Sequence, residues 1–199
     1  MIKAIILSLI IGVVYGQFFL EPSHAVNFSY LSDIALVVLM FSVGISVGAN
    51  KQVFSKIKEH HIKILIIPIG IILGSIAGGF LCSILMDMPL NVSVAITSGL
   101  GWYSLSGVLI TDLAGADLGT IAFLANLFRE ILSFMLIPIV AKYCNHYTAI
   151  APAAATSEDT TLPVLIKYTS EEVVIMAVIN GVICSMMVPV LTNLFYRIL

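Results

Sequence analysis

The chain has 199 residues, of which 60% are hydrophobic and 10% charged, and its mean hydropathy of +1.11 lies well above that of soluble domains. The formal net charge of −2, with no basic tail or stripe, argues against a nucleic-acid partner. Because a helix needs about 20 apolar residues to cross a bilayer, the length allows at most about seven to nine crossings and no soluble domain. The sequence therefore predicts an all-α polytopic membrane protein with one integral membrane domain over residues 1–199.

The first two apolar runs cover residues 2–20 and 31–49. The first resembles the start of a signal peptide but lacks a small-x-small cleavage site, so we expect a retained span. The connection between the two runs has no basic residue, whereas the next one, residues 50–63, carries four lysines, Lys51, Lys56, Lys58 and Lys63. By the positive-inside rule, this basic loop is predicted to be cytoplasmic.

A third span, residues 62–86, is predicted to run outward. The region after it, up to Asp117, has apolar stretches much shorter than a full crossing, split by SGLGWYSLSG. We expect a hairpin or broken helix here, with both ends at the outer face. A full span over residues 118–141 then returns to the inside, where Lys142 lies.

The same pattern then recurs in the opposite sense. A short apolar half, residues 149–155, is followed by the polar break TSEDTTLP and a second short half that ends at Lys167. A last span over residues 173–195 is predicted to leave the C-terminus outside. The expected fold thus has about five full transmembrane helices plus two broken or re-entrant segments.

Spans and broken segments therefore alternate, and the broken segments enter from opposite faces. This order predicts an inverted-topology repeat, in which paired interrupted segments mark a transporter's binding site near the bilayer midplane. The two broken pieces are not obviously alike in sequence, so the prediction depends on hydropathy and topology.

Two charges lie side by side in the middle of the span over residues 118–141. A charge at the bilayer centre costs about 2.5 to 3.5 kcal/mol, so Arg129 and Glu130 are expected to face protein or water. One alternative is that they neutralise each other or are capped by polar neighbours. Adjacent helical residues point about 100° apart, which makes a mutual pair a poor explanation and predicts partners on other segments. Asn126 lies three residues before Arg129 and four before Glu130, so the three residues form a polar stripe along the helix.

The break ATSEDTTLP supplies the second candidate group. Pro163 follows it, so we expect the helix to open and leave carbonyl groups unpaired, which is tolerated at membrane depth only beside a cavity or under protein. Its polar residues include Ser157, Asp159 and Thr160. The alternative is an ordinary cytoplasmic loop with a helix cap.

The break TSGLGWYSLSG supplies the third group, because its small residues let the backbone turn while Trp102, Tyr103 and Ser104 offer amphipathic and hydroxyl groups. Trp102 alternatively anchors at the headgroup level. Asn180, in the last span, is expected to face either the same cavity or a helix partner. The candidate substrate- and proton-binding residues are Glu130, Asp159, Arg129, Asn126, Ser157, Thr160, Trp102, Tyr103 and Ser104.

No enzyme, metal site or cofactor is expected. The three cysteines stand singly, without metal-ligand spacing. An intramembrane aspartyl protease needs two facing aspartates, but Asp112 is placed near a surface and no GxGD stretch is present.

In combination, GWYSLSG, FLANLFRE, ATSEDTTLP and NGVICSMMVPVL resemble the lysine exporter LysO family of bacterial and archaeal inner membranes. The resemblance is dense from residue 62 to the C-terminus and loose over the first two spans. It implies export of L-lysine and its toxic analogue thialysine from the cytoplasm, with the proton gradient as energy source. It also implies that Glu130 and Asp159 are the intramembrane acidic residues that such exporters use.

The chain departs from this family in two ways. The run APAAATS has fewer glycines than many relatives, which predicts a stiffer half-helix. Many relatives carry further spans before the matched region, and some lineages divide the protein between two chains. The expected partners are thus lysine and its analogues, membrane lipid, and either a second copy of the chain or a small membrane protein.

Three functions remain open from the sequence. The first is proton-coupled lysine antiport, in which protons and lysine compete for Glu130 and Asp159, while Arg129 and the half-helix end near Trp102 bind the carboxylate. The second is transport of another cationic or small amino acid. The third is a membrane subunit that is active only with a partner chain.

Overall fold

The computed structural model describes residues 2–18, five single positions between residues 31 and 45, and residues 63–199. It divides into two compact units, Met1–Ile45 and Ser46–Leu199, which are described separately. In the first unit, α1 (Ile2–Phe18) covers nearly all of the first predicted span. The five single positions are helical and fall within the second predicted span; the rest of that span and the basic loop up to residue 62 lie outside the described residues.

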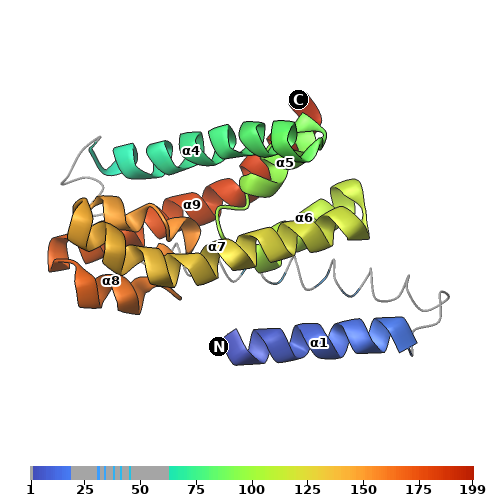
Figure 1. Ribbon diagram of the computed structural model, residues 1–199, viewed down its shortest axis with the longest axis horizontal. Coiled ribbons are helices and arrows are strands. Elements are labelled where there is room, and N and C mark those ends of the chain that lie inside the picture. The colour runs from blue at the N-terminus through green and yellow to red at the C-terminus, as the bar shows by residue number, and fades with distance from the viewer. Residues whose placement is uncertain are drawn as a thin grey trace. The chain divides into compact units, whose positions relative to one another are not determined.

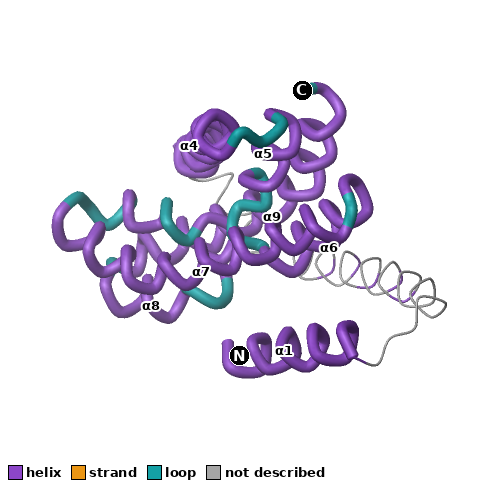
Figure 2. Tube along the Cα trace, turned by 45° about the vertical axis from the view of Figure 1, so that its right-hand side comes forward, coloured by secondary structure: helices purple, strands orange, loops and turns teal. Residues whose placement is uncertain are grey.

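Within the described part of the chain, three helices are long and apolar enough to cross a bilayer. They are α4 (Lys63–Met86), α7 (Ala116–Tyr143) and α9 (Glu171–Ile198), and they begin and end within three residues of the predicted spans. The described elements are all helices and turns, without a strand (Figure 2). These features show a membrane protein; the predicted total of about five spans stays a prediction.

The ends of α7 and α9 follow the same charge pattern. Each helix has 28 residues, with at least one acidic side chain in its first turn and one basic side chain in its last turn. Asp117 and Lys142 have these places in α7, and Glu171 and Arg197 have them in α9. Because the N-terminal end of a helix is partly positive and the C-terminal end partly negative, these charges stabilise both ends.

The first broken segment consists of α5 (Leu90–Thr97), a turn over residues 98–102, and α6 (Tyr103–Ala114). The predicted interruption at SGLGWYSLSG is present. The turn passes through two residues with positive φ, Leu100 at 49° and Gly101 at 91°. Left-handed backbone is easily adopted by glycine but is costly for leucine, so the surrounding packing must hold this turn in place.

The second broken segment differs from the expected pair of half-helices. The apolar half predicted for residues 149–155 is not an α-helix but consists of turns and two short 3-10 helices, η1 (Thr148–Ile150) and η2 (Ala154–Glu158). Pro152 has no N–H to donate, and Ala154 adopts a φ of 50°, so regular i to i−4 bonding is not possible here. A helix of seven residues, α8 (Leu162–Tyr168), follows the break.

In the second unit, α4, α7 and α9 run along the length of the structure, and the broken segments take opposite ends (Figure 1). Both α5 and α6 lie at the end where α4 stops and α7 starts, while α8 and the 3-10 turns lie at the other end (Figures 1 and 2). Each broken segment therefore enters and leaves the bundle at one end and reaches only its middle.

Candidate functional site

The tips of the two broken segments meet through their backbones. The N–H of Ala155 donates a hydrogen bond to the carbonyl oxygen of Leu100 at 3.1 Å. Leu100 and Ala154 are both completely buried and both have positive φ. The chain thus adopts unfavourable backbone angles on each side of this crossing, and the crossing pairs two groups that neither broken helix satisfies.

An asparagine from a neighbouring long helix holds each break. Asn126 on α7 accepts a hydrogen bond from the N–H of Gly101 at 2.8 Å and donates to the carbonyl of Ile96 at 3.0 Å. Asn180 on α9 donates to the carbonyl of Ala154 and to the Ser157 hydroxyl, both at 3.0 Å. The amide of Asn126, which was predicted as a binding residue, positions the first break, and its binding role stays a prediction.

Glycine brings the backbone close to its neighbour at both places. A Cβ added at Gly99 would lie 2.5 Å from Asn126 Nδ2, and one added at Gly181 would lie 2.5 Å from the Cβ of Glu158. Any other residue at these two positions would push the breaks away from α7 and α9.

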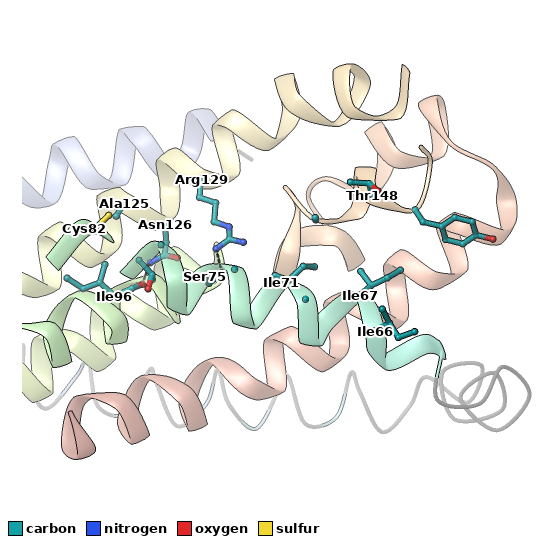
Figure 3. Close-up of a pocket in the computed structure, with 16 residues that line it drawn as sticks. Ile66, Ile67, Ile71, Ser75, Cys82, Ile96, Ala125, Asn126, Arg129 and Thr148 are labelled. Carbon is teal, nitrogen blue, oxygen red and sulfur yellow. Dashed lines mark hydrogen bonds between the residues drawn. The ribbon is translucent and has the colours of Figure 1, made fainter. Parts of the chain in front are cut away.

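Arg129 leaves α7 on the side that faces α4. It donates a hydrogen bond to Ser75 Oγ at 2.9 Å, as Figure 3 shows, and no carboxylate among the described residues forms an ion pair with it. It lines a largely apolar cavity of about 690 Å³, together with Ile67, Ile71 and Gly74 on α4 and Thr148 on η1 (Figure 3). The guanidinium is the charged group among the lining residues of this cavity.

Glu130 points in a different direction and is not part of that cavity. Its side chain is 2% exposed. It interacts with the side chain of Thr160 and with the carboxyl of Asp159. Glu130 Oε1 and Thr160 Oγ1 are nevertheless both buried without a completed hydrogen bond. A buried carboxyl oxygen without a donor is costly, so this position is suited to a proton or to a ligand that donates hydrogen bonds.

Asp159 lies in the second break and is exposed, with its Oδ1 accepting a hydrogen bond from the N–H of Thr160. The phenol of Tyr103 interacts electrostatically with both Glu130 and Asp159. Its ring packs edge to face against Phe123 at 5.3 Å. The structure therefore brings Glu130, Asp159, Thr160 and Tyr103 together around one point.

Other predicted residues have different surroundings. Ser157 is completely buried, and its hydroxyl lies within donating distance of the carbonyls of Ala154 and Ala177, at 2.8 and 2.7 Å. Trp102 is half-buried at the start of α6, and Ser104 is exposed on that helix. None of these contacts tests the proposed binding roles, which stay predictions.

The structure also adds residues that were not among the predicted binding residues. Glu158 points toward α9, where the Ser185 hydroxyl donates a hydrogen bond to its Oε1 at 2.8 Å. Asn180 was expected to face either the cavity or a helix partner; its amide binds the second break, at Ala154 and Ser157. Ser75, the partner of Arg129, lies in the sequence GSIAGG, which reads as helix packing and gives no sign of a polar role.

The candidate site combines acidic and basic groups. Glu130 on α7 lies near Asp159 of the second break, and the Arg129 guanidinium faces α4. Among the described residues, no group of three or more histidine, cysteine or acidic side chains is arranged to bind a metal ion. A ligand with both amine and carboxylate groups matches these charges.

Comparison with known proteins gives the family. The chain matches the family model described as lysine exporter LysO over residues 6–196. It is 36% identical to the lysine exporter LysO of Escherichia coli over 164 residues, which are 82% of this chain and 54% of the relative. It is also 36% identical to a putative lysine exporter of Haemophilus influenzae over 196 residues, 94% of each chain. The chain thus spans about half of the first relative and nearly all of the second. No solved structure matches it.

Proposed function

Since the chain belongs to the lysine exporter LysO family, a family of transporters, we propose that it exports L-lysine, and thialysine with it, by antiport against protons. Both relatives bear the name of lysine exporter, which supports the substrate. We place the protein in the inner membrane, with the basic loop of residues 50–63 in the cytoplasm and the C-terminus outside.

The observation that carries this proposal is the buried Glu130 carboxyl, whose Oε1 has no hydrogen-bond donor although Asp159 and Thr160 lie beside it. A proton or an ammonium group can neutralise this carboxyl, but the two compete for the same oxygen atoms. When the site is open to the outside, protons bind to its carboxyl groups and lysine is released. When the site is open to the cytoplasm, the protons leave and lysine binds again. Asp159, exposed at the break, is the group through which protons and lysine reach Glu130.

The remaining predicted residues complete the site in this proposal. Arg129 attracts the substrate carboxylate. Trp102, Tyr103 and Ser104 form the wall at the N-terminal end of α6, where the helix dipole also favours an anion. Asn126, Ser157 and Thr160 shape the two breaks around the substrate. No cofactor is required, because the proton gradient supplies the energy.

We also propose that α5 to α7 and η1 to α9 are the two halves of an inverted-topology repeat. In each half, a broken segment precedes a helix of 28 residues, and an asparagine of that helix holds the break. The two broken segments enter from opposite ends of the bundle (Figure 1). Opposed half-length segments that meet near the middle are typical of secondary transporters with alternating access.

One competing function has a specific observation in its favour. It is a protein that is active only as a homodimer or beside a small partner membrane chain; the matched region is 54% of the Escherichia coli relative. A second alternative is transport of another cationic or small amino acid, and arginine and ornithine meet the same charge requirements as lysine. Competition by arginine, ornithine and neutral amino acids in the assay below distinguishes these substrates.

The test is counterflow of labelled lysine in liposomes that contain the purified protein. We expect Glu130→Gln and Asp159→Asn to reduce counterflow at least about tenfold, since each removes a charge that contacts the ammonium group. Asp117→Asn, which removes an exposed carboxylate from the first turn of α7, is the matched control. Undiminished counterflow in both site variants would refute the proposal, whereas inactivity of the wild type that a second chain restores would favour the subunit function.

A further inference from the structure

The cavity beside Arg129 is long and follows α4. Its lining on that helix extends from Ile66 to Cys82, which is about 24 Å at a rise of about 1.5 Å per residue. Three glycines of α4 belong to this lining, Gly70, Gly74 and Gly78. A Cβ added at any of them would meet no atom of the described residues within 4 Å. The wall along α4 is therefore open, and the volume of about 690 Å³ is in the range of small-molecule binding sites.

Free hydrogen-bond donors are concentrated at one point of this cavity. Arg129 uses one of its five N–H groups for Ser75 Oγ, at 2.9 Å. Ser75 accepts that bond, so its own hydroxyl hydrogen is available to a second acceptor. The other lining side chains with nitrogen or oxygen atoms already have hydrogen-bond partners, namely Thr97, Asn126, Tyr147 and Thr148. A ligand that accepts hydrogen bonds is thus expected beside Arg129 and Ser75, about midway along the wall.

The charge of Arg129 is not balanced inside the cavity. Arginine stays protonated in proteins, and a charge near the middle of a membrane helix is costly unless it is paired or hydrated. Within the part of the chain that the structure describes, no acidic side chain lines the cavity. Glycines spaced by four residues are often helix-packing positions, but packing alone does not account for a guanidinium that opens onto them. The cavity consequently matches a ligand with one anionic group and an apolar body.

We propose that this cavity binds a single-chain carboxylate of the fatty-acid type, with its carboxylate on Arg129 and Ser75 and its alkyl chain along α4. A carboxylate accepts two parallel hydrogen bonds from a guanidinium. From Ser75 to Ile66 the wall continues for about 14 Å, lined by isoleucine and glycine, which suits an alkyl chain. The phosphate of a phospholipid lies in the headgroup region, far from the middle of α7 where Arg129 lies, so a single-chain carboxylate fits better.

This inference goes beyond the proposed function. Lysine does not fit the cavity as a whole, because no described carboxylate lines it to bind an ammonium group. Both ligands nevertheless use Arg129, which the proposed function assigns to the carboxylate of lysine. A fatty acid from the membrane is therefore expected to inhibit lysine counterflow by competing for this guanidinium.

The experiment is photolabelling of the full chain in nanodiscs of phosphatidylcholine, without lysine. The probe is decanoate with a diazirine at the end of its chain, and mass spectrometry maps the labelled residues. In the wild type we expect labels on α4 between Ile66 and Cys82. Excess unlabelled decanoate should reduce this labelling at least about fivefold, whereas decanol, with the same chain and no charge, should reduce it less than about twofold.

Two variants separate the charge from the shape of the cavity. Arg129→Gln removes the charge and should reduce the labelling of α4 at least about fivefold. Gly74→Leu fills the open space beside Ser75, leaves every polar group in place and favours the helix, so it should give the same loss even if Arg129→Gln does not fold. The controls are Arg197→Gln, at an exposed position in the last turn of α9, and Ala77→Leu, at an exposed position of α4 outside the cavity lining. Both should label like the wild type.

The inference is overturned by labelling that decanol suppresses as well as decanoate, or that persists in either folded variant. Absence of label on α4 in the wild type also overturns it, since that result indicates that another helix packs on the glycines. Because lysine is absent from this assay, its outcome does not depend on lysine transport. Failure of the counterflow test would leave fatty-acid binding in place, and failure of photolabelling would leave lysine export in place.

Discussion

The two broken segments use the same construction for different purposes. Both have a left-handed residue at the tip, both are held by an asparagine of the following long helix, and both approach a helix closely at a glycine. The first has α-helices on both sides of its turn and carries no charged residue between Leu90 and Thr111. The second has 3-10 turns before its break and the short helix α8 after it, and it carries Glu158 and Asp159 at the break.

In the proposed function, the first segment supports the structure of the site and the second segment carries its carboxyl groups. Two short helices make the first segment regular on both sides of its turn, and the groups left over at the turn are bound by Asn126 and Ala155. The second segment gives up regular bonding, and in return its carboxyl groups lie at the crossing. Irregular backbone at membrane depth is tolerated where it is covered by protein or lines a cavity, and the described contacts of η2 with α9 provide the cover.

The largest expected effect comes from uncoupling the two segments. Ala155→Pro removes the N–H that donates to Leu100, and it also restricts Ala154, which must keep a φ of 50°. We expect a loss of about 3 kcal/mol or more of stability, seen as unfolded or aggregated protein in size-exclusion chromatography with detergent. Ala155→Gly keeps the N–H and is the control. A Pro variant as stable as the wild type would show that the crossing bond is dispensable.

A medium effect is expected from the two asparagines, and here the segments should differ. Asn126→Ala leaves the Gly101 N–H buried without an acceptor, at a cost of about 1–3 kcal/mol. After Asn180→Ala, the Ser157 hydroxyl still reaches the Ala154 carbonyl, so the loss of stability should be smaller. The break that carries Glu158 and Asp159 is loosened, however, so the KM for lysine should rise more.

Thermal unfolding in detergent and the KM of lysine counterflow measure these two quantities. The expected result is a crossed pattern: Asn126→Ala lowers the unfolding temperature more, and Asn180→Ala raises the KM more. Equal changes in both quantities would mean that the segments do not divide support and binding.

The smallest expected effect is at Ser75, on the side of Arg129 that faces α4. Ser75→Ala removes one hydrogen bond from the guanidinium, and because the other N–H groups of Arg129 can rearrange, the loss should stay below the about 1.5–3 kcal/mol of a hydrogen bond to a charged group. We expect a severalfold increase in the KM for lysine with little change in stability. Ser104→Ala, on the exposed face of α6, is the comparison at the first break. A KM for Ser75→Ala equal to that of the wild type would remove Arg129 from carboxylate binding or make its orientation independent of Ser75.

Hydropathy was sufficient to find α4, α7 and α9, because the length of an apolar run directly reports a crossing. It also located both interruptions, since glycine, proline and polar residues stand out within apolar sequence. The divergence of Arg129 and Glu130 followed from helix geometry, and the structure confirms it: one faces Ser75 and the other Thr160.

The sequence did not reveal which polar groups support the backbone and which are available to a ligand. Asn126 and Ser157 have the residue types of a binding site, but their hydrogen bonds are used by the breaks. The left-handed conformation of Ala154 and the tertiary bond of Ala155 beside it are encoded by no local pattern, although Pro152 is a local signal against a regular helix. The direction of Glu158 depends on the absence of a side chain at Gly181, 23 residues later in the chain.

The backbone bond between Ala155 and Leu100 also has a mechanical consequence. Two segments joined by one hydrogen bond can rotate about it with little change in the donor–acceptor distance. Sliding one segment past the other breaks the bond. The N–H to carbonyl contact between the two tips therefore suits a pivot, beside the proposed binding site. A transporter built in this way is expected to change its access by rocking its two halves, with the substrate near the axis, where displacement is smallest.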